Sequence, residues 1–89
     1  MIRRPFSRQA EKGLQALSAE NRKRAITALR RFDASPRHPS LNFERLAGHG
    51  NLYSIRISRT HRAILRRVEG TADTYDLMDV GPHDIYRRL

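Results

Sequence analysis

The stretch Leu52-Tyr-Ser-Ile-Arg-Ile-Ser-Arg-Thr-His-Arg-Ala-Ile-Leu-Arg-Arg-Val68 reads as two strands joined by a short polar turn. In its first half, apolar residues alternate with polar ones, the period of two that is typical of a strand buried on one face. In its second half, Ala63 and Leu65 continue the apolar face, while Arg62, Ile64 and Arg66 point the other way. This stretch therefore predicts a β-hairpin, and the rest of the chain is interpreted around it.

The register of the hairpin follows from its apolar positions. Directly opposed residues share a face, so Ile55 is expected opposite Ala63, which places Arg56 opposite Arg62. Like charges directly opposite each other destabilise a sheet by about 0.2–1 kcal/mol. Two explanations remain open at this point. A bound polyanion would relieve the repulsion, or the two side chains would simply splay into water.

Positive charge is the strongest signal in the composition. The 89 residues carry a formal net charge of +9, and sixteen of the eighteen basic residues are arginine. Between Arg37 and Arg67 there are seven arginines and a single acid, Glu44. Arginine forms a planar fork suited to phosphate and carboxylate. The pattern predicts nucleic acid or an acidic protein as partner, with salt-dependent binding. The alternative is an arginine-rich coding background, which leaves the scarcity of acids unexplained.

Length and composition exclude several classes of protein. A single domain spanning residues 1–89 is expected, large enough to fold on one core. The chain has no cysteine, so it has neither a disulfide framework nor a thiolate zinc site, which fits a reducing cytoplasm. No apolar run approaches the ~20 residues of a membrane span. We expect a cytoplasmic protein with no membrane segment, no cofactor and no metal site.

The first 32 residues predict a short strand and two helices. Residues 1–6 are interpreted as a short edge strand, because proline at position 5 is tolerated there. Ser7 and Ser18 are candidate N-caps of two helices. Apolar residues recur at helical spacing behind each cap (Ala10, Leu14, Leu17; Ala25, Ile26, Leu29, Phe32). Two antiparallel helices are favoured over one long kinked helix because Ser18 is placed to cap the second.

The rest of the chain completes an α+β pattern. Residues 33–40 form a proline-containing loop, residues 41–46 an extended or short helical piece, and residues 74–80 a third strand after the hairpin. Residues 83–89 are expected to form a short polar tail, for which a helical conformation is left open. The order β-α-α-β-β-β predicts one small α+β domain, with two N-terminal helices packed on one face of a mostly antiparallel sheet. The opposite face would carry Arg56 and Arg62.

Three motifs stand at the ends of the predicted strands. They are Leu46-Ala-Gly48 leading into Leu52-Tyr-Ser-Ile-Arg-Ile57, then His61-Arg62, then Val80-Gly-Pro-His83-Asp-Ile-Tyr86. In this order and spacing the chain resembles the RelE/ParE superfamily of bacterial toxin–antitoxin systems over nearly its whole length. The resemblance implies a RelE-like fold and a cognate antitoxin, held in a toxin–antitoxin hetero-oligomer. Nuclease members such as RelE and YoeB cut messenger RNA in the ribosomal A site, whereas ParE members poison DNA gyrase.

The resemblance also implies roles for individual residues. Cleavage of RNA without a metal needs a base for the 2′-hydroxyl, cations for the phosphorane and an acid for the leaving oxygen. Arg62 stands where nuclease members keep the arginine that stabilises the transition state, and Arg56 lies near a basic residue that some members carry. His83 stands where members carry the arginine or histidine that protonates the leaving group. Glu44 is the carboxylate near the position of the base in YoeB-like members.

The remaining site residues are binding residues. Tyr86 resembles a C-terminal tyrosine that stacks on or orients a base. Three further arginines of the basic segment are assigned to RNA binding (Arg45, Arg59, Arg66). Ser54 stands where RelE itself carries a lysine, so the lysine-rich base region of RelE is not reproduced.

Structural roles compete with these assignments. His83 could merely lie exposed on a solvated tail, and Tyr86 could close the edge of the sheet.

Three classes of function therefore remain. The pairing of His83 and Tyr86 with the two hairpin arginines favours an mRNA interferase, an endoribonuclease that acts on RNA at the ribosome. A gyrase inhibitor acting by protein contact, or a non-catalytic basic binding module, are the alternatives.

Overall fold

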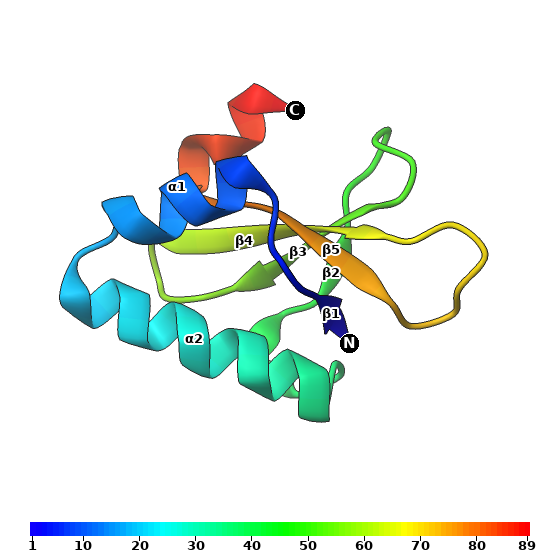
Figure 1. Ribbon diagram of the computed structural model, residues 1–89, viewed down its shortest axis with the longest axis horizontal. Coiled ribbons are helices and arrows are strands. Elements are labelled where there is room, and N and C mark those ends of the chain that lie inside the picture. Colours follow the sequence, from blue (N-terminus) through cyan, green and yellow to red (C-terminus); the bar gives the residue numbers. More distant parts are fainter.

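The predicted hairpin forms part of a five-stranded sheet with the strand order β1-β5-β4-β3-β2. The computed structural model describes residues 1–89 (Figure 1). Its elements in chain order are β1 (Ile2–Arg3), α1 (Arg8–Ala16), α2 (Ala19–Ala34), η1 (Pro39–Leu41), β2 (Glu44–Arg45), β3 (Leu52–Arg56), β4 (His61–Arg67), β5 (Tyr75–Pro82) and η2 (His83–Arg88), where η denotes a 3₁₀ helix. All neighbouring strands are antiparallel except β1, which pairs with β5 in parallel. The predicted α+β class is confirmed.

The register of the hairpin is the one that the apolar pattern predicts. Ile55 pairs with Ala63, and Arg56 pairs with Arg62. Ile55, Ala63 and Leu65 are fully buried in one core with residues of both helices and of β5. We call the face of the sheet that packs on this core the inner face, and the opposite one the outer face.

Both helices begin at the predicted serine caps. The hydroxyl of Ser7 accepts a hydrogen bond from the backbone N–H of Ala10 at 3.1 Å. The hydroxyl of Ser18 accepts one from the N–H of Asn21, also at 3.1 Å. The two helices are therefore separate, as expected, because each cap satisfies a donor that no preceding turn can reach.

The buried stripe of α2 differs from the predicted one at a single position. Ile26 is 43% exposed, and Ala28 takes its place beside Ala25, Leu29 and Phe32 in the core. These four residues follow the spacing i, i+3, i+4, i+7 of one helix face, whereas Ile26 lies about 100° further round. The expectation for Ile26 was wrong because residue hydrophobicity was given more weight than the period.

Two short edge strands flank the longer ones. The first strand is only Ile2–Arg3, shorter than the predicted residues 1–6. Glu44–Arg45 forms β2, an additional strand within the segment expected to be extended or helical. Asn42 before β2 has a positive φ of 45°, and Gly48 and Gly50 after it have φ of 78° and 59°. Left-handed residues therefore lie in the connections on both sides of β2.

The C-terminal segment covers part of the outer face, which the sequence had assigned to arginines and solvent. Ile64 of β4 is fully buried, and Ile85 of η2 is 1% exposed. A Cβ atom at Gly81 would lie 2.6 Å from Cγ2 of Ile85, so η2 packs directly against the backbone of β5. Asp79 beneath η2 forms an ion pair with Arg88 at 2.9 Å. The tail expected to be polar is therefore a packed element.

Helix α1 lies very close to β5. A Cβ atom at Gly13 would overlap the carbonyl oxygen of Val80. Only glycine permits this approach of a helix to a strand backbone.

None of the helices has both the length and the apolar character that a membrane span requires.

Candidate active site

The candidate site lies where the β3–β4 turn meets the start of η2. The backbone N–H of His83 donates to the carbonyl oxygen of Thr60 in the turn at 2.9 Å. On the outer face, Arg56, Arg62 and Gly81 form one row across β3, β4 and β5. The sheet thus brings the two hairpin arginines to the same end of the molecule as the first residues of η2. In the sequence, Arg56 and His83 are 27 positions apart.

The two arginines of the row differ in their freedom. Nη1 of Arg62 donates to the carbonyl oxygen of Ser58 at 2.7 Å and to that of His61 at 2.9 Å. Arg62 is half-buried, and these bonds hold its guanidinium against the turn. Arg56 is exposed, and neither arginine forms an ion pair with a carboxylate. One hydrogen-bonded and one unbonded guanidinium therefore stand on neighbouring strands, and an anion could contact both.

His83 and Tyr86 lie on the same turn of η2. Their rings meet edge to face with centroids 5.0 Å apart. His83 is exposed and Tyr86 is half-buried, while Ile85 between them is buried and anchors the element. The tyrosine ring thus limits the orientations of the imidazole, and both rings remain accessible to a ligand.

Glu44 lies on the same outer face as the arginine row. Glu44 pairs with Ser54 across β2 and β3, so it is a diagonal neighbour of Arg56. Diagonal neighbours on one face of a sheet are about 7–8 Å apart. Glu44 is exposed and has no ion-pair partner. The carboxylate and the two arginines therefore follow each other across the sheet, and His83 begins the segment that directly follows β5.

The three arginines assigned to RNA binding lie in three different environments. Arg59 is exposed in the β3–β4 turn, next to the row. Arg66 lies on the outer face, with Nη2 3.4 Å from Oδ2 of Asp76. Arg45 pairs with Tyr53 and lies on the inner face. Of the three, Arg66 thus lies on the face of the candidate site, and Arg59 lies in the turn beside it.

Asp76 partly neutralises the outer face away from the row. Its carboxylate accepts hydrogen bonds from Nε and Nη2 of Arg3, both at 2.8 Å. The hydrogen bonds from Arg3 are the main cause of a lowered pKa for Asp76, and Arg66 lowers that pKa further, against burial. The charge of Arg66 is therefore shared with a carboxylate, whereas those of Arg56 and Arg62 are not.

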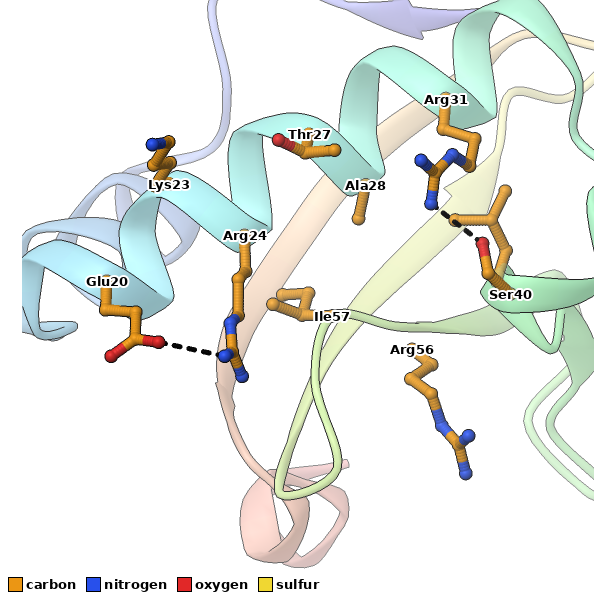
Figure 2. Close-up of a pocket in the computed structure, with 10 residues that line it drawn as sticks. Glu20, Lys23, Arg24, Thr27, Ala28, Arg31, Ser40, Arg56 and Ile57 are labelled. Carbon is orange, nitrogen blue, oxygen red and sulfur yellow. Dashed lines mark hydrogen bonds and ion pairs between the residues drawn. The ribbon is translucent and has the colours of Figure 1, made fainter.

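A basic groove extends from Arg56 along α2, and the sequence did not reveal it. This cavity of about 440 Å³ is lined by three cations of α2 together with Arg56 and two hydroxyl residues (Lys23, Arg24, Arg31, Thr27, Ser40). Figure 2 shows Arg24 bound to Glu20 and Arg31 bound to Ser40, at 2.8 and 3.0 Å. Lys23, Thr27 and Arg31 recur every four residues, a spacing that could have revealed one helix face.

Three solved structures resemble this fold closely. They are chains of a RelB–RelE antitoxin–toxin complex from Methanococcus jannaschii, of a YoeB/ParE toxin from Agrobacterium tumefaciens and of the intact RelBE toxin–antitoxin complex of E. coli. The TM-scores are 0.72, 0.70 and 0.66, with sequence identities of 23%, 20% and 22%. The alignments cover 94%, 88% and 86% of this chain and 96%, 94% and 90% of the others. The fold is therefore that of RelE-like toxins.

The sequence itself gives the family. Residues 19–87 match the ParE-like toxin domain, so the chain belongs to the ParE-like toxin family. No curated protein sequence matches it.

Proposed function

We propose that this toxin is a metal-free endoribonuclease that cleaves messenger RNA at the ribosome in the cytoplasm. The proposal rests on the spatial order of four side chains at one end of the outer face. Glu44 comes first, then Arg56 and Arg62, and then His83 at the start of η2. These groups supply the base, the cations and the acid that phosphodiester cleavage requires.

The proposed reaction is an internal transesterification, in which the phosphorus moves from the 5′-oxygen to the 2′-oxygen and each proton is accounted for. Glu44 takes the proton of the 2′-hydroxyl, and the 2′-oxygen attacks the adjacent phosphorus. Arg56 and Arg62 stabilise the negative charge of the phosphorane by charge-assisted hydrogen bonds. His83, in its protonated form, gives a proton to the 5′-oxygen as the P–O bond breaks. The products are a 2′,3′-cyclic phosphate and a free 5′-hydroxyl. Tyr86 stacks on a base and orients His83.

The test combines translating ribosomes, a defined messenger RNA and the purified protein, and maps the ends of the cut RNA. We expect cleavage with cyclic phosphate ends, a strong loss with Arg62→Ala, and full activity with the matched control Arg30→Gln. Arg30 is exposed on α2 and lies outside the row. An intact message in the presence of wild-type protein would reject the nuclease.

Inhibition of DNA gyrase is the second candidate, and the match to the ParE-like toxin domain favours it. Such an inhibitor would act by protein contact and would not need His83 and Tyr86 as a pair. A supercoiling assay with purified gyrase separates the two functions. A protein that neither cleaves messenger RNA nor inhibits gyrase would be a binding module of the same fold.

We also propose that an antitoxin protein binds this toxin in a hetero-oligomer. Two of the similar structures are antitoxin–toxin complexes, and a net charge of +9 favours an acidic partner. Electrostatic attraction chiefly speeds association, and salt screens it. Association rates that do not change between low and high salt would show that the charge does not guide this partner.

A further inference from the structure

A second cluster of arginines lies on the inner face, in an open pocket of about 400 Å³. Three arginines and three aromatic residues line this pocket (Arg37, Arg45, Arg67, Phe43, Tyr53, Tyr75). We call it the inner arginine pocket. No carboxylate is among the residues that line it. The site proposed for RNA cleavage uses none of them, so their arrangement requires a separate explanation.

Each arginine of the pocket is held in place without an acidic partner. Nε of Arg45 donates to the carbonyl oxygen of Gly50 at 3.1 Å, and Nη1 of Arg67 donates to that of Thr71 at 2.9 Å. The guanidinium carbon of Arg37 lies 5.7 Å from the ring centroid of Phe43. None of the three forms an ion pair within the chain. Their remaining N–H groups stay available, and their mutual repulsion would fall if an anion bound.

The aromatic residues form a floor in which the rings pack against one another. Tyr53 and Tyr75 meet edge to face at 5.6 Å, and Phe43 and Tyr75 do so at 5.9 Å. Phe32 of α2 packs against Phe43 and Tyr75 from below. Burial and the neighbouring Tyr53 raise the pKa of Tyr75, with Arg67 and Arg37 acting in the opposite direction. The Tyr75 hydroxyl therefore remains a donor at neutral pH.

The pocket lies far from the candidate active site. Arg62 and Arg67 are five residues apart in β4, so they point to opposite faces of the sheet. At ~3.3 Å per residue their backbones are about 17 Å apart. An RNA strand bound across Arg56 and Arg62 would have to pass around the sheet edge to enter the pocket.

We propose that the inner arginine pocket binds a carboxylate side chain, aspartate or glutamate, from an acidic segment of a protein partner. Arginine forks bind carboxylates through paired hydrogen bonds, and the apolar ring edges suit the aliphatic part of such a segment. The identity of the partner as the antitoxin rests on the proposed function, whereas the carboxylate specificity rests on the pocket alone.

The test uses a fluorescein-labelled peptide of alternating glutamate and leucine, titrated by fluorescence anisotropy at low and moderate salt. The double variant R45Q/R67Q should weaken peptide binding at least tenfold. The matched control R8Q/R30Q removes the same charge from exposed arginines of the two helices and should weaken binding less than threefold. A peptide with glutamine in place of glutamate should not bind measurably to wild type or to either double variant.

Two further measurements keep the test interpretable. R45Q/R67Q removes two hydrogen bonds to turn carbonyls, so its effect on binding could come from a change in structure. Arg37→Gln breaks no hydrogen bond within the chain and serves as a second variant. It should weaken peptide binding at least threefold. Cleavage of messenger RNA is assayed in parallel and should be the same for wild type and for Arg37→Gln. Equal weakening by pocket and control variants would overturn the proposal, as would an Arg37→Gln variant that loses RNA cleavage and binds the peptide as wild type does. Failure of the wild type to cleave RNA would reject the nuclease without affecting the peptide result.

Discussion

Arg56 and Arg62 stand directly opposite each other across the β3–β4 hairpin, and no carboxylate pairs with either one. Such a pair costs stability in the free protein, by about 0.2–1 kcal/mol for opposed like charges. The turn carbonyls hold Arg62, whereas Arg56 extends into solvent. The arrangement is consistent with a surface that is most stable when an anion is bound.

The two arginines should therefore respond differently to substitution. Arg62→Ala should reduce RNA cleavage by about 10²–10³. It should also destabilise the fold by about 1 kcal/mol, because two bonds to the turn are lost. Arg56→Ala should lower cleavage while leaving the free energy of unfolding unchanged or slightly higher. Urea unfolding and the cleavage assay measure the two effects. A marked loss of stability in Arg56→Ala would contradict this account of the pair.

Gly13→Ala should destabilise the protein, although alanine is normally the better helix residue by about 1 kcal/mol. The added Cβ would overlap the carbonyl oxygen of Val80, so α1 or β5 must shift. Replacing the exposed Gln15 of the same helix with alanine is the control and should change stability by no more than a few tenths of a kcal/mol. The measurement is the midpoint of urea unfolding. A more stable Gly13→Ala variant would mean that α1 does not lie this close to β5.

Asp76 should make the stability of the protein fall at acidic pH. Hydrogen bonds from Arg3 lower the pKa of Asp76 in the folded state, so the unfolded chain binds the proton more readily. The contribution is present above the ordinary aspartate pKa of about 3.9 and is lost as pH falls through the lower folded value. Asp76→Asn should thus be less stable than wild type at pH 7, with a smaller difference near pH 2. A constant difference across this range would exclude the mechanism.

The parts of the fold that the sequence predicted depend on local rules. The caps at Ser7 and Ser18 and the register of the hairpin follow from neighbouring residues and from the period of two. Apart from Ile26, where the helical period was available and was not followed, the errors concern contacts between distant segments. Burial of Ile64 depends on η2, which closes over it from about twenty residues away, and nothing in the local pattern of the tail announces this.

The same distinction applies to the candidate site. The sequence placed Arg56 and Arg62 together because both lie in one hairpin. It grouped Arg45 with them, but the pairing of β2 with β3 turns Arg45 to the inner face beside Tyr53. A shift of one residue changes the face of a strand, and a two-residue strand has no periodicity from which to read it. The bonds from Arg62 to the turn were equally unpredictable, because they depend on side-chain conformation.

The last prediction separates catalysis from contact with a protein target. His83→Gln should reduce cleavage by about 10²–10⁴, the range for loss of a general acid. In wild type the rate should fall as pH rises, because neutral imidazole cannot donate the proton, and this dependence should disappear in the variant. Tyr86→Phe keeps the ring contact with His83 at 5.0 Å and should have a small effect. Tyr86→Ala should cost more, because stacking on a base is worth about 1–3 kcal/mol.

Two controls make this result specific. Arg87→Gln removes a charge from the same helical segment at an exposed position and should leave cleavage and its pH dependence unchanged. The same variants are tested in parallel for inhibition of gyrase. If wild-type protein inhibits gyrase without cutting RNA, and substitution of His83 has no effect on that inhibition, the nuclease proposal fails and action through protein contact replaces it. If His83→Gln cleaves RNA with the pH profile of wild type, another group must donate the proton.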